Sequence, residues 1–448
     1  MPQSTHFPAL AERVHRQRTL QPGLYGDVDF TARPYRLATG ATDETALPAW
    51  VDDRAAILAD ERLVELMSTA TMLGDVVADP YASLMATRSF KSLIDMLLRA
   101  CREGLDAVPD APPELRAFVA AMEATPSWLD MGLVEEGARH ARIPGAFLSP
   151  FVTRGAFVAT FMNTYAALPM ALTGALGGRK AARRVNETSS FFAVTTLPGA
   201  LNRFGPGFEA AAMVRLMHSM VRYNALKRSD RWDLDVYGIP IPQLDQMPAG
   251  LINVYLVAAK ARREGRTEFT SGERALVEFG RYRCFLLGLP EELLPTTVDG
   301  VLRALHARAA VLREGFDDDT CGALVRATME AYLPVGRTPR DRAFDAVERS
   351  YSKAFFLRTF GRGGRAAQMG VRFTKADAAR VAVTAPFVLG RFVAVQAAAR
   401  LPLLRGPVDA YAIRVLKRRL KTYGTAEFTT DATTYAPVDR TATAGATA

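Results

Sequence analysis

Cysteine and histidine, the residues that most often build disulfides and metal sites, are both scarce in this chain of 448 residues. The three cysteines, Cys101, Cys284 and Cys321, lie far apart and form no CxxC pair. This spacing argues against a disulfide framework and against a cysteine-built zinc or iron–sulfur site. The five histidines form no HExxH or HxxxH pair, so the sequence offers no protein-only site for a lone metal ion.

An export signal is also missing. Residues 1–20 contain no long apolar stretch and no adjacent arginine pair, so we expect a cytoplasmic protein. One uncharged run, 155–178, is long enough to cross a membrane. Because Asn163 and Pro169 dilute this run, and Arg154 and Arg179 flank it, a buried core helix is the favoured interpretation. A membrane segment is the alternative.

The charge is only weakly one-sided, with 56 basic and 47 acidic residues and a net charge of +9. Basic and acidic residues are interleaved along the chain, which is typical of solvated helix faces, and no nucleic-acid partner is expected. The basic stretch 414–421 leaves two alternatives open. It could make a peripheral contact with anionic lipid, or it could be a solvated last helix, which is the favoured interpretation.

The apolar residues, 49% of the chain, recur mainly with helical spacing. Thr270 and Glu273 match the capping-box pattern of a helix start, and so do Thr374 and Asp377. Alternation with period two is almost absent, so strands are not expected. The sequence therefore predicts an all-α protein.

The organisation along the chain is predicted to be simple. One large helical domain is expected over residues 49–424, since no linker rich in Gly, Ser or Pro divides it. Residues 1–48 are polar and broken by four prolines, and we expect them to form a loosely ordered arm. Residues 425–448 are rich in Thr and Ala with few core formers, and we expect them to be disordered.

The segment 208–226 carries the most chemical information. On a helix, Arg215, His218 and Arg222 share one narrow stripe, while methionine and aliphatic residues occupy the other side. One interpretation is an amphipathic helix whose polar stripe faces water. The other is a buried imidazole flanked by two guanidiniums, which suits an iron porphyrin because the macrocycle supplies four of the iron ligands.

A second polar stripe lies upstream. Arg184, Glu187, Thr188 and Phe191 would line one helix face, bringing an acid, a hydroxyl and an arginine together against apolar neighbours. Such a face could form one wall of a ligand site. The alternative is an ordinary surface pair between Arg184 and Glu187 or Thr188.

These two segments together resemble the latex clearing protein family, the rubber oxygenases, and the wider group of mpaB-type oxygenases. The resemblance is carried by four segments in order. They are R-x-x-E-T at 184–188, R-x-x-H-x-x-x-R at 215–222, G-I-P-I-P-Q-L-D at 238–245, and L-L-G-L-P at 286–290 continuing to Pro295. The likeness runs over about 110–400, which would be the catalytic core.

The resemblance implies an all-helical, globin-like core that holds one b-type heme and uses O2 as co-substrate. His218 would be the iron ligand, and Arg184, Arg215 and Arg222 would lie beside the heme. Thr188 would lie on the distal side. The family reaction is insertion of O2 across a carbon–carbon double bond, and the run 155–178 would bury the heme.

The sequence departs from the family pattern at two points. Glu187 stands where rubber cleavers with a closed heme carry a lysine, so Glu187 is instead a candidate base or hydrogen-bond acceptor if burial raises its pKa. In addition, the run 155–178 contains no acid that could serve as the usual catalytic glutamate. We therefore expect Arg184, Glu187 and Thr188 to be the catalytic group.

Three hypotheses follow. The leading one is a heme-dependent oxygenase acting on a hydrophobic, unsaturated small molecule such as an isoprenoid or a lipid. The second is a heme-binding protein without turnover. The third is a heme-free helical protein, possibly at a membrane surface, in which the 215–222 stripe faces solvent.

Overall fold

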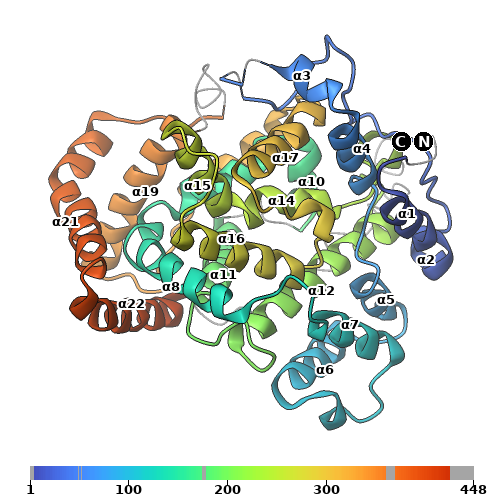
Figure 1. Cartoon of the computed structure of the whole chain (residues 1–448), viewed down its shortest axis with the longest axis horizontal. Helices are drawn as coiled ribbons and strands as arrows, with labels where there is room; N and C mark the ends of the chain where they lie inside the picture. The colour runs from blue at the N-terminus through green and yellow to red at the C-terminus, as the bar shows by residue number, and fades with distance from the viewer. Residues whose placement is uncertain (1–4, 49, 52, 174–177, 360–368, 424–448) are drawn as a thin grey trace, which may run out of the picture.

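The computed structural model describes residues 5–423, apart from residues 49, 52, 174–177 and 360–368 (Figure 1). Within these described ranges the chain forms helices and no strands. Two isolated bridges, Leu37 with Leu312 and Thr45 with Arg313, are the extended pairings that occur there. The prediction of an all-α fold is confirmed. The tail expected to be disordered, 425–448, lies outside the described residues.

The helices follow one another with short connections. The α-helices are α1 (Pro8–Leu20), α2 (Pro22–Tyr25), α3 (Arg54–Ala59), α4 (Glu61–Ala70), α5 (Ala78–Ser83), α6 (Phe90–Glu103), α7 (Pro113–Glu123), α8 (Met131–Phe147), α9 (Thr153–Val158), α10 (Thr164–Leu172), α11 (Gly178–Val194), α12 (Pro206–Arg228), α13 (Leu234–Tyr237), α14 (Gln243–Gly250), α15 (Ile252–Arg263), α16 (Ser271–Leu286), α17 (Val298–Val311), α18 (Ala323–Glu330), α19 (Pro339–Thr359), α21 (Lys375–Ala399) and α22 (Pro402–Tyr423). The short 3-10 segments are η1 (Leu84–Ala86), η2 (Leu105–Ala107), η3 (Ser149–Phe151), η4 (Ala159–Phe161) and η5 (Glu291–Leu293), and η6 (Asp318–Gly322) is a π-helical turn.

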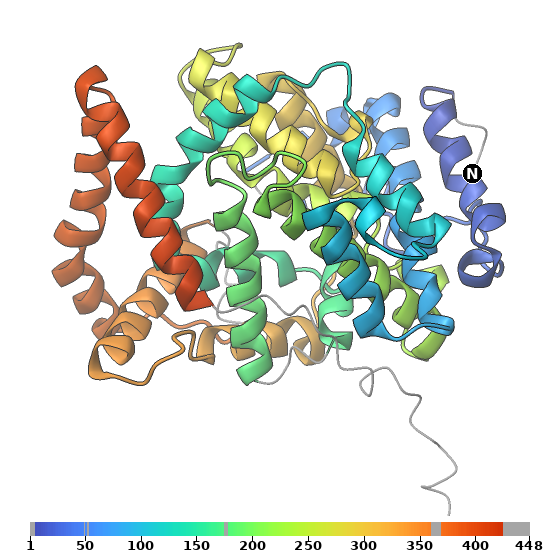
Figure 2. The same cartoon turned by 90° about the horizontal axis from the view of Figure 1, so that it is seen from below.

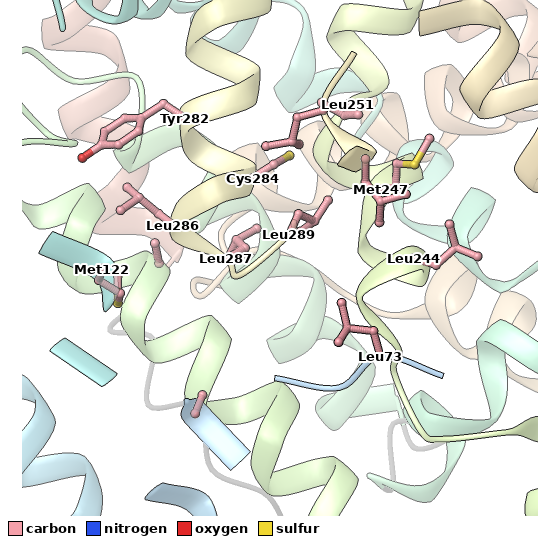
Figure 3. Packing of buried hydrophobic residues seen from close by; sticks show 14 of the residues in the cluster. Leu73, Met122, Leu244, Met247, Leu251, Tyr282, Cys284, Leu286, Leu287 and Leu289 are labelled. Atoms are coloured by element: carbon pink, nitrogen blue, oxygen red, sulfur yellow. The ribbon is translucent and has the colours of Figure 1, made fainter. Parts of the chain in front are cut away.

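One large apolar cluster holds the central helices together. Helix α16 packs along α8, and α12 packs against α5, α6, α11 and α16. Figure 3 shows part of the cluster, where Cys284 of α16 points toward Leu251, at the end of α14, and Leu286 lies on the side of Met122 of α7. Burial of this kind removes apolar surface from water and is the main force that stabilises such a fold.

Residues 5–48 belong to the packed body, although the sequence predicts a loosely ordered arm there. The Tyr25 hydroxyl donates a hydrogen bond to Asp79 Oδ2 over 2.5 Å. Arg36, which is 1% exposed, forms an ion pair with Asp245 over 2.7 Å. The segment also adds buried apolar side chains to the main cluster: Leu10, Val14, Leu24, Val28, Phe30 and Leu37. Two of the four prolines that suggested a loose arm, Pro8 and Pro22, begin α1 and α2, where the missing N–H costs nothing.

The uncharged run 155–178 is not one core helix, which corrects the favoured interpretation. Residues 155–172 of it are divided between α9, η4 and α10, and the chain bends by 109° at the break, while residues 174–177 lie outside the described residues. Asn163 causes the restart, because its side chain accepts the hydrogen bond of Tyr165 N and caps α10. Most of its apolar side chains are buried, including Phe157, Val158 and Leu168.

The predicted helix caps are present. Thr270 with Glu273 and Thr374 with Asp377 both form reciprocal capping boxes, at the starts of α16 and α21. Helices α21 and α22 pack on each other at the end of the longest axis opposite to α1 and α2 (Figures 1 and 2). By length and composition, one described helix, α21, could cross a membrane. If α9–η4 and α10 are taken together as one bent span, the number of candidate spans is two.

Candidate functional site

The stripe of Arg215, His218 and Arg222 on α12 faces the interior of the protein. Arg215 is 6% exposed and Arg222 is fully buried, and His218 is partly buried. Buried guanidiniums are rare unless they are paired. The interpretation in which this stripe faces water is therefore wrong, and the periodicity that brought the three residues together is confirmed.

His218 is held through only one of its ring nitrogens. Its Nδ1 lies 3.0 Å from Gln246 Oε1, which accepts the proton of the Nδ1–H tautomer. Nε2 has no hydrogen-bond partner among the residues that the structure describes. Burial, together with the nearby charge of Arg222, lowers the pKa of His218 to about 4, although the bond to Gln246 and the charge of Asp75 oppose this. The imidazole is thus neutral at physiological pH and keeps a lone pair available on Nε2.

A chain of polar side chains fixes Gln246. Gln246 Nε2 donates to Gln243 Oε1 over 2.5 Å, and Gln243 Nε2 lies 3.5 Å from Asp75 Oδ2. Asp75 in turn accepts both hydrogen bonds of the Arg215 guanidinium, over 2.5 and 2.9 Å. Burial alone would raise the pKa of Asp75, but Arg215 outweighs it and holds this pKa below its ordinary value. The orientation of His218 therefore depends on Arg215 through three intervening side chains, those of Gln246, Gln243 and Asp75.

Gly288 makes room for this ion pair. Its backbone has φ of +92°, and a Cβ at this position would lie 2.7 Å from Asp75 Oδ2 and 2.8 Å from Arg215 Nε. Only glycine combines this backbone conformation with so close an approach. The L-L-G-L-P segment thus joins the same site as the R-x-x-H-x-x-x-R segment.

Arg222 holds the loop that precedes α14. Its guanidinium pairs with buried Asp79 and donates to the carbonyl oxygens of Pro240, over 2.8 Å, and Ile241, over 2.5 Å. Ile241 has φ of +45°, a strained conformation for a β-branched residue. Burial raises the pKa of Asp79 and Arg222 only partly offsets it. Since this loop leads into Gln243 and Gln246, Arg222 also supports His218 indirectly.

Helix α11 brings the second predicted stripe to the same region. Glu187 is 5% exposed, and its carboxylate lies 2.9 Å from Arg183 Nε and 3.4 Å from Arg184 NH1. Arg184 lies close enough to His218 to contribute to its lowered pKa. Thr188 is partly buried, and its hydroxyl has no hydrogen-bond partner within the described ranges. The simple surface-pair interpretation is wrong, because the carboxylate of the pair is buried.

Arg283 of α16 is a buried cation that the sequence reasoning missed. It is 2% exposed, and no carboxylate of the described residues lies within ion-pair distance. Its NH2 donates to Gly250 O over 2.9 Å, its Nε has no partner, and the guanidinium stacks on Phe192 at 4.8 Å. Burial lowers its pKa. Phe192 follows Thr188 by one turn of α11, and Gly250 follows Gln246 by one turn of α14, so Arg283 adjoins the His218 site.

Asp75 and Asp79 were also missed, although the sequence carries a signal for them. They are the only charged residues between Thr71 and Thr87 in an otherwise apolar stretch. Isolated acids in such a setting are typical of buried ion pairs. Their partners, Arg215 and Arg222, lie more than a hundred residues away, so the pairing itself could not be predicted from spacing.

Groups of three or more His, Cys, Asp or Glu able to hold a metal ion are absent from the part of the chain that the structure describes. Two pockets of the described protein have linings that do not include His218. One of about 240 Å³ is lined by residues of 27–34 and 233–235 with Met72. The other, of about 460 Å³, lies between α8, α21 and α22.

Comparisons with known proteins give the family and the fold of the chain. The sequence profile described as "ER-bound oxygenase mpaB/B'/Rubber oxygenase, catalytic domain" matches residues 145–393. This span is more than half of the chain, so the chain belongs to this oxygenase family. Its fold is similar to the solved structure titled "Structure of Latex Clearing Protein LCP in the closed state", with a TM-score of 0.55 and 16% identity over 80% of this chain and 92% of that chain. No curated protein sequence matches the chain. The predicted family is confirmed.

Proposed function

We propose that the protein is a b-type heme-dependent oxygenase that inserts O2 across a carbon–carbon double bond of a hydrophobic, unsaturated substrate, isoprenoid or lipid-like. The observation that carries the proposal is His218, a neutral imidazole oriented by Gln246, whose Nε2 has no partner among the described residues. Membership of an oxygenase family supports the class of reaction. The globin-like character of the core and the cytoplasmic location stay predictions.

The donor set fits a heme better than a bare metal ion. A bare ion needs several protein ligands, and no such group exists among the described residues. A porphyrin supplies four ligands itself and needs one neutral imidazole nitrogen from the protein, which His218 offers. A hydrogen bond from the other ring nitrogen is the usual support for a ligating histidine, and Gln246 provides it.

We assign the two heme propionates to Arg184 and Arg283. A buried guanidinium without an acidic partner is costly. Arg283 is such a case, since it is buried and no acidic partner is found among the described residues. A propionate would supply the missing counter-charge. Arg215 and Arg222 are bound to Asp75 and Asp79, so we give them positioning roles toward His218 rather than contacts with the heme.

When bound, the heme supplies a ferrous iron at which O2 is activated. On the protein side, Thr188 can donate a hydrogen bond, because its hydroxyl has no partner among the described residues. Glu187 can accept a proton or a hydrogen bond at its carboxylate, and Arg184 orients that carboxylate over 3.4 Å. The apolar shell of α9, α10 and α11 would exclude water and favour a hydrophobic substrate.

Heme binding is tested by absorption spectroscopy of purified and hemin-reconstituted protein. We expect a Soret band with one heme per chain, and its loss in His218→Ala with helical circular dichroism retained. His306→Ala is the matched control, since His306 is also partly buried and bonded through one ring nitrogen, to Tyr255. A parent protein that cannot bind hemin, or a His218→Ala protein with an unchanged spectrum, would remove the proposal.

Turnover separates an oxygenase from a protein that only binds heme. We expect the reduced holoprotein, given O2 and isoprenoid alkenes of different length, to form aldehyde or ketone products detectable by mass spectrometry after carbonyl derivatisation. Glu187→Gln and Thr188→Val should lower the rate while leaving the Soret band in place. Heme binding without carbonyl products from any alkene would favour the non-catalytic alternative.

A further inference from the structure

Helix α21 exposes an apolar face that no other part of the described protein covers. In its most apolar window of 18 residues only 6% of the residues are buried. Val383, Phe387 and Val393 are 71%, 76% and 62% exposed, and Leu403, at the start of α22, is 91% exposed. Nine of the large apolar side chains that are exposed fall between residues 373 and 411. Contiguous exposed apolar surface of this kind marks an interaction site.

The opposite face of α21 is anchored to the protein body. It packs against α8, α19 and α22, and Asp377 in its first turn is bound by Ser350 and Lys353. A helix tied down along one side cannot cross a bilayer without leaving those contacts. It can lie in the interface with its free face among lipid chains.

The charges around this face are basic. Arg372 and Lys375 lie at the start of α21 and Arg400 at its end, and none of the three forms an ion pair within the described ranges. Arg380 and Arg405 also lie there, paired with Asp377 and Glu136. Between 381 and 399 the only charged residue is Arg391. An apolar strip bordered by cations complements an anionic lipid surface. Two copies of the chain packed through this strip would instead bring like charges together.

A pocket of about 460 Å³ opens beside the strip. It is lined by Phe147, Phe151, Phe387 and Val415 together with Arg391 and Arg419. Neither arginine has an acidic partner among the described residues: Arg391 stacks on Phe147 at 4.8 Å and Arg419 on Phe344 at 4.7 Å. Most other enclosed arginines, such as Arg36, Arg142, Arg154 and Arg222, do pair with carboxylates.

We propose that the α21–α22 hairpin docks the protein on bilayers that contain anionic phospholipid, with the apolar face of α21 among the lipid chains and Arg391 and Arg419 binding a headgroup phosphate. The matching family profile ends at residue 393, so the end of α21 and all of α22, with Leu403 and Arg419, lie beyond the shared domain. The inference does not depend on the heme proposal, because it uses none of the residues of the His218 site.

The role of the apolar face of α21 is tested by co-sedimentation of the full chain with vesicles of phosphatidylcholine, with or without phosphatidylglycerol. We expect binding to the mixed vesicles, and a loss of about tenfold or more in Val383→Asp and in Phe387→Asp. Leu256→Asp is the matched control, since Leu256 is 51% exposed on α15. Both sites are exposed, so circular dichroism should be unchanged. Loss of binding in the Leu256→Asp control to the same extent would overturn the assignment to α21.

The role of Arg391 and Arg419 in binding the headgroup phosphate is tested with the variants Arg391→Gln and Arg419→Gln. Each should weaken binding to the mixed vesicles about fivefold, the equivalent of about 1 kcal/mol per basic residue, and reduce its sensitivity to salt. Arg116→Gln, an exposed arginine of α7, serves as control. Equal binding to neutral and mixed vesicles, saturable binding of a free fatty acid in place of vesicles, or a dimer that dissociates in Val383→Asp would each overturn the proposal.

Discussion

At the scale of the residue, the site depends on how buried charges are compensated. Arg215 and Arg222 each bind a buried aspartate, whereas the partners of Arg283 within the described part of the chain are a carbonyl oxygen and two aromatic rings. A buried pair loses stability when one partner is removed, because the other charge is left uncompensated. A buried cation without a partner behaves differently, since its removal also removes a desolvation cost.

This difference gives a prediction for Arg283→Met. Without heme, the free energy of unfolding should stay within about 1 kcal/mol of the parent, because methionine fills similar space and carries no charge. Affinity for hemin should fall about tenfold, the equivalent of losing one charge-assisted hydrogen bond. Denaturant unfolding and hemin titration measure the two effects separately.

Arg222→Met is the matched comparison, because it leaves Asp79 buried and unpaired. It should cost about 3–5 kcal/mol of stability. If Arg283→Met were equally destabilising and bound hemin as tightly as the parent, Arg283 would be a structural residue and its assignment to a propionate would be wrong.

At the scale of the element, α12 shows what helical periodicity can predict. The spacing of Arg215, His218 and Arg222 correctly places them on one stripe. It cannot tell which way the stripe faces, because the opposite side of α12, with Leu216 and Met220, is buried as well. A helix buried all round gives no amphipathic contrast, so only the family resemblance favoured the buried interpretation.

The groups that complete the site come from elements that local spacing cannot connect. Gln246 of α14 and the loop carrying Asp75 meet α12 only through tertiary packing. Likewise, the bend of the 155–178 run depends on Asn163 acting as a cap, which competes with continuing the helix. Capping boxes were predictable because both partners lie within one turn.

At the scale of the whole molecule, His218 predicts how stability depends on pH. Its pKa is about 4 when folded against 6.5 ordinarily, so the unfolded chain binds a proton that the folded protein does not. Stability is therefore complete above about pH 6.5 and is lost as the pH falls toward 4. For the apoprotein we expect a loss of about 2 kcal/mol from this residue between about pH 7 and pH 5.

Denaturant unfolding at the two pH values, for the parent and for His218→Leu, isolates this contribution from that of the carboxylates. Between about pH 7 and pH 5 the variant should lose about 2 kcal/mol less stability than the parent. Identical pH profiles would mean that the imidazole can take up a proton in the folded state.

Residues near the N-terminus form backbone hydrogen bonds with segments that are synthesised much later. Backbone N–H groups of Tyr35 and Arg36 donate to Asp235 and Val236, and Arg313 N donates to Arg36 O. During synthesis at about 5–20 residues per second, the first fifty residues must wait on the order of ten seconds to a minute for these partners. Through that interval the early segment can pack only on its near neighbours, such as α4. Apolar side chains that later segments will cover stay exposed, so we expect the nascent chain to be a client for chaperones on the ribosome.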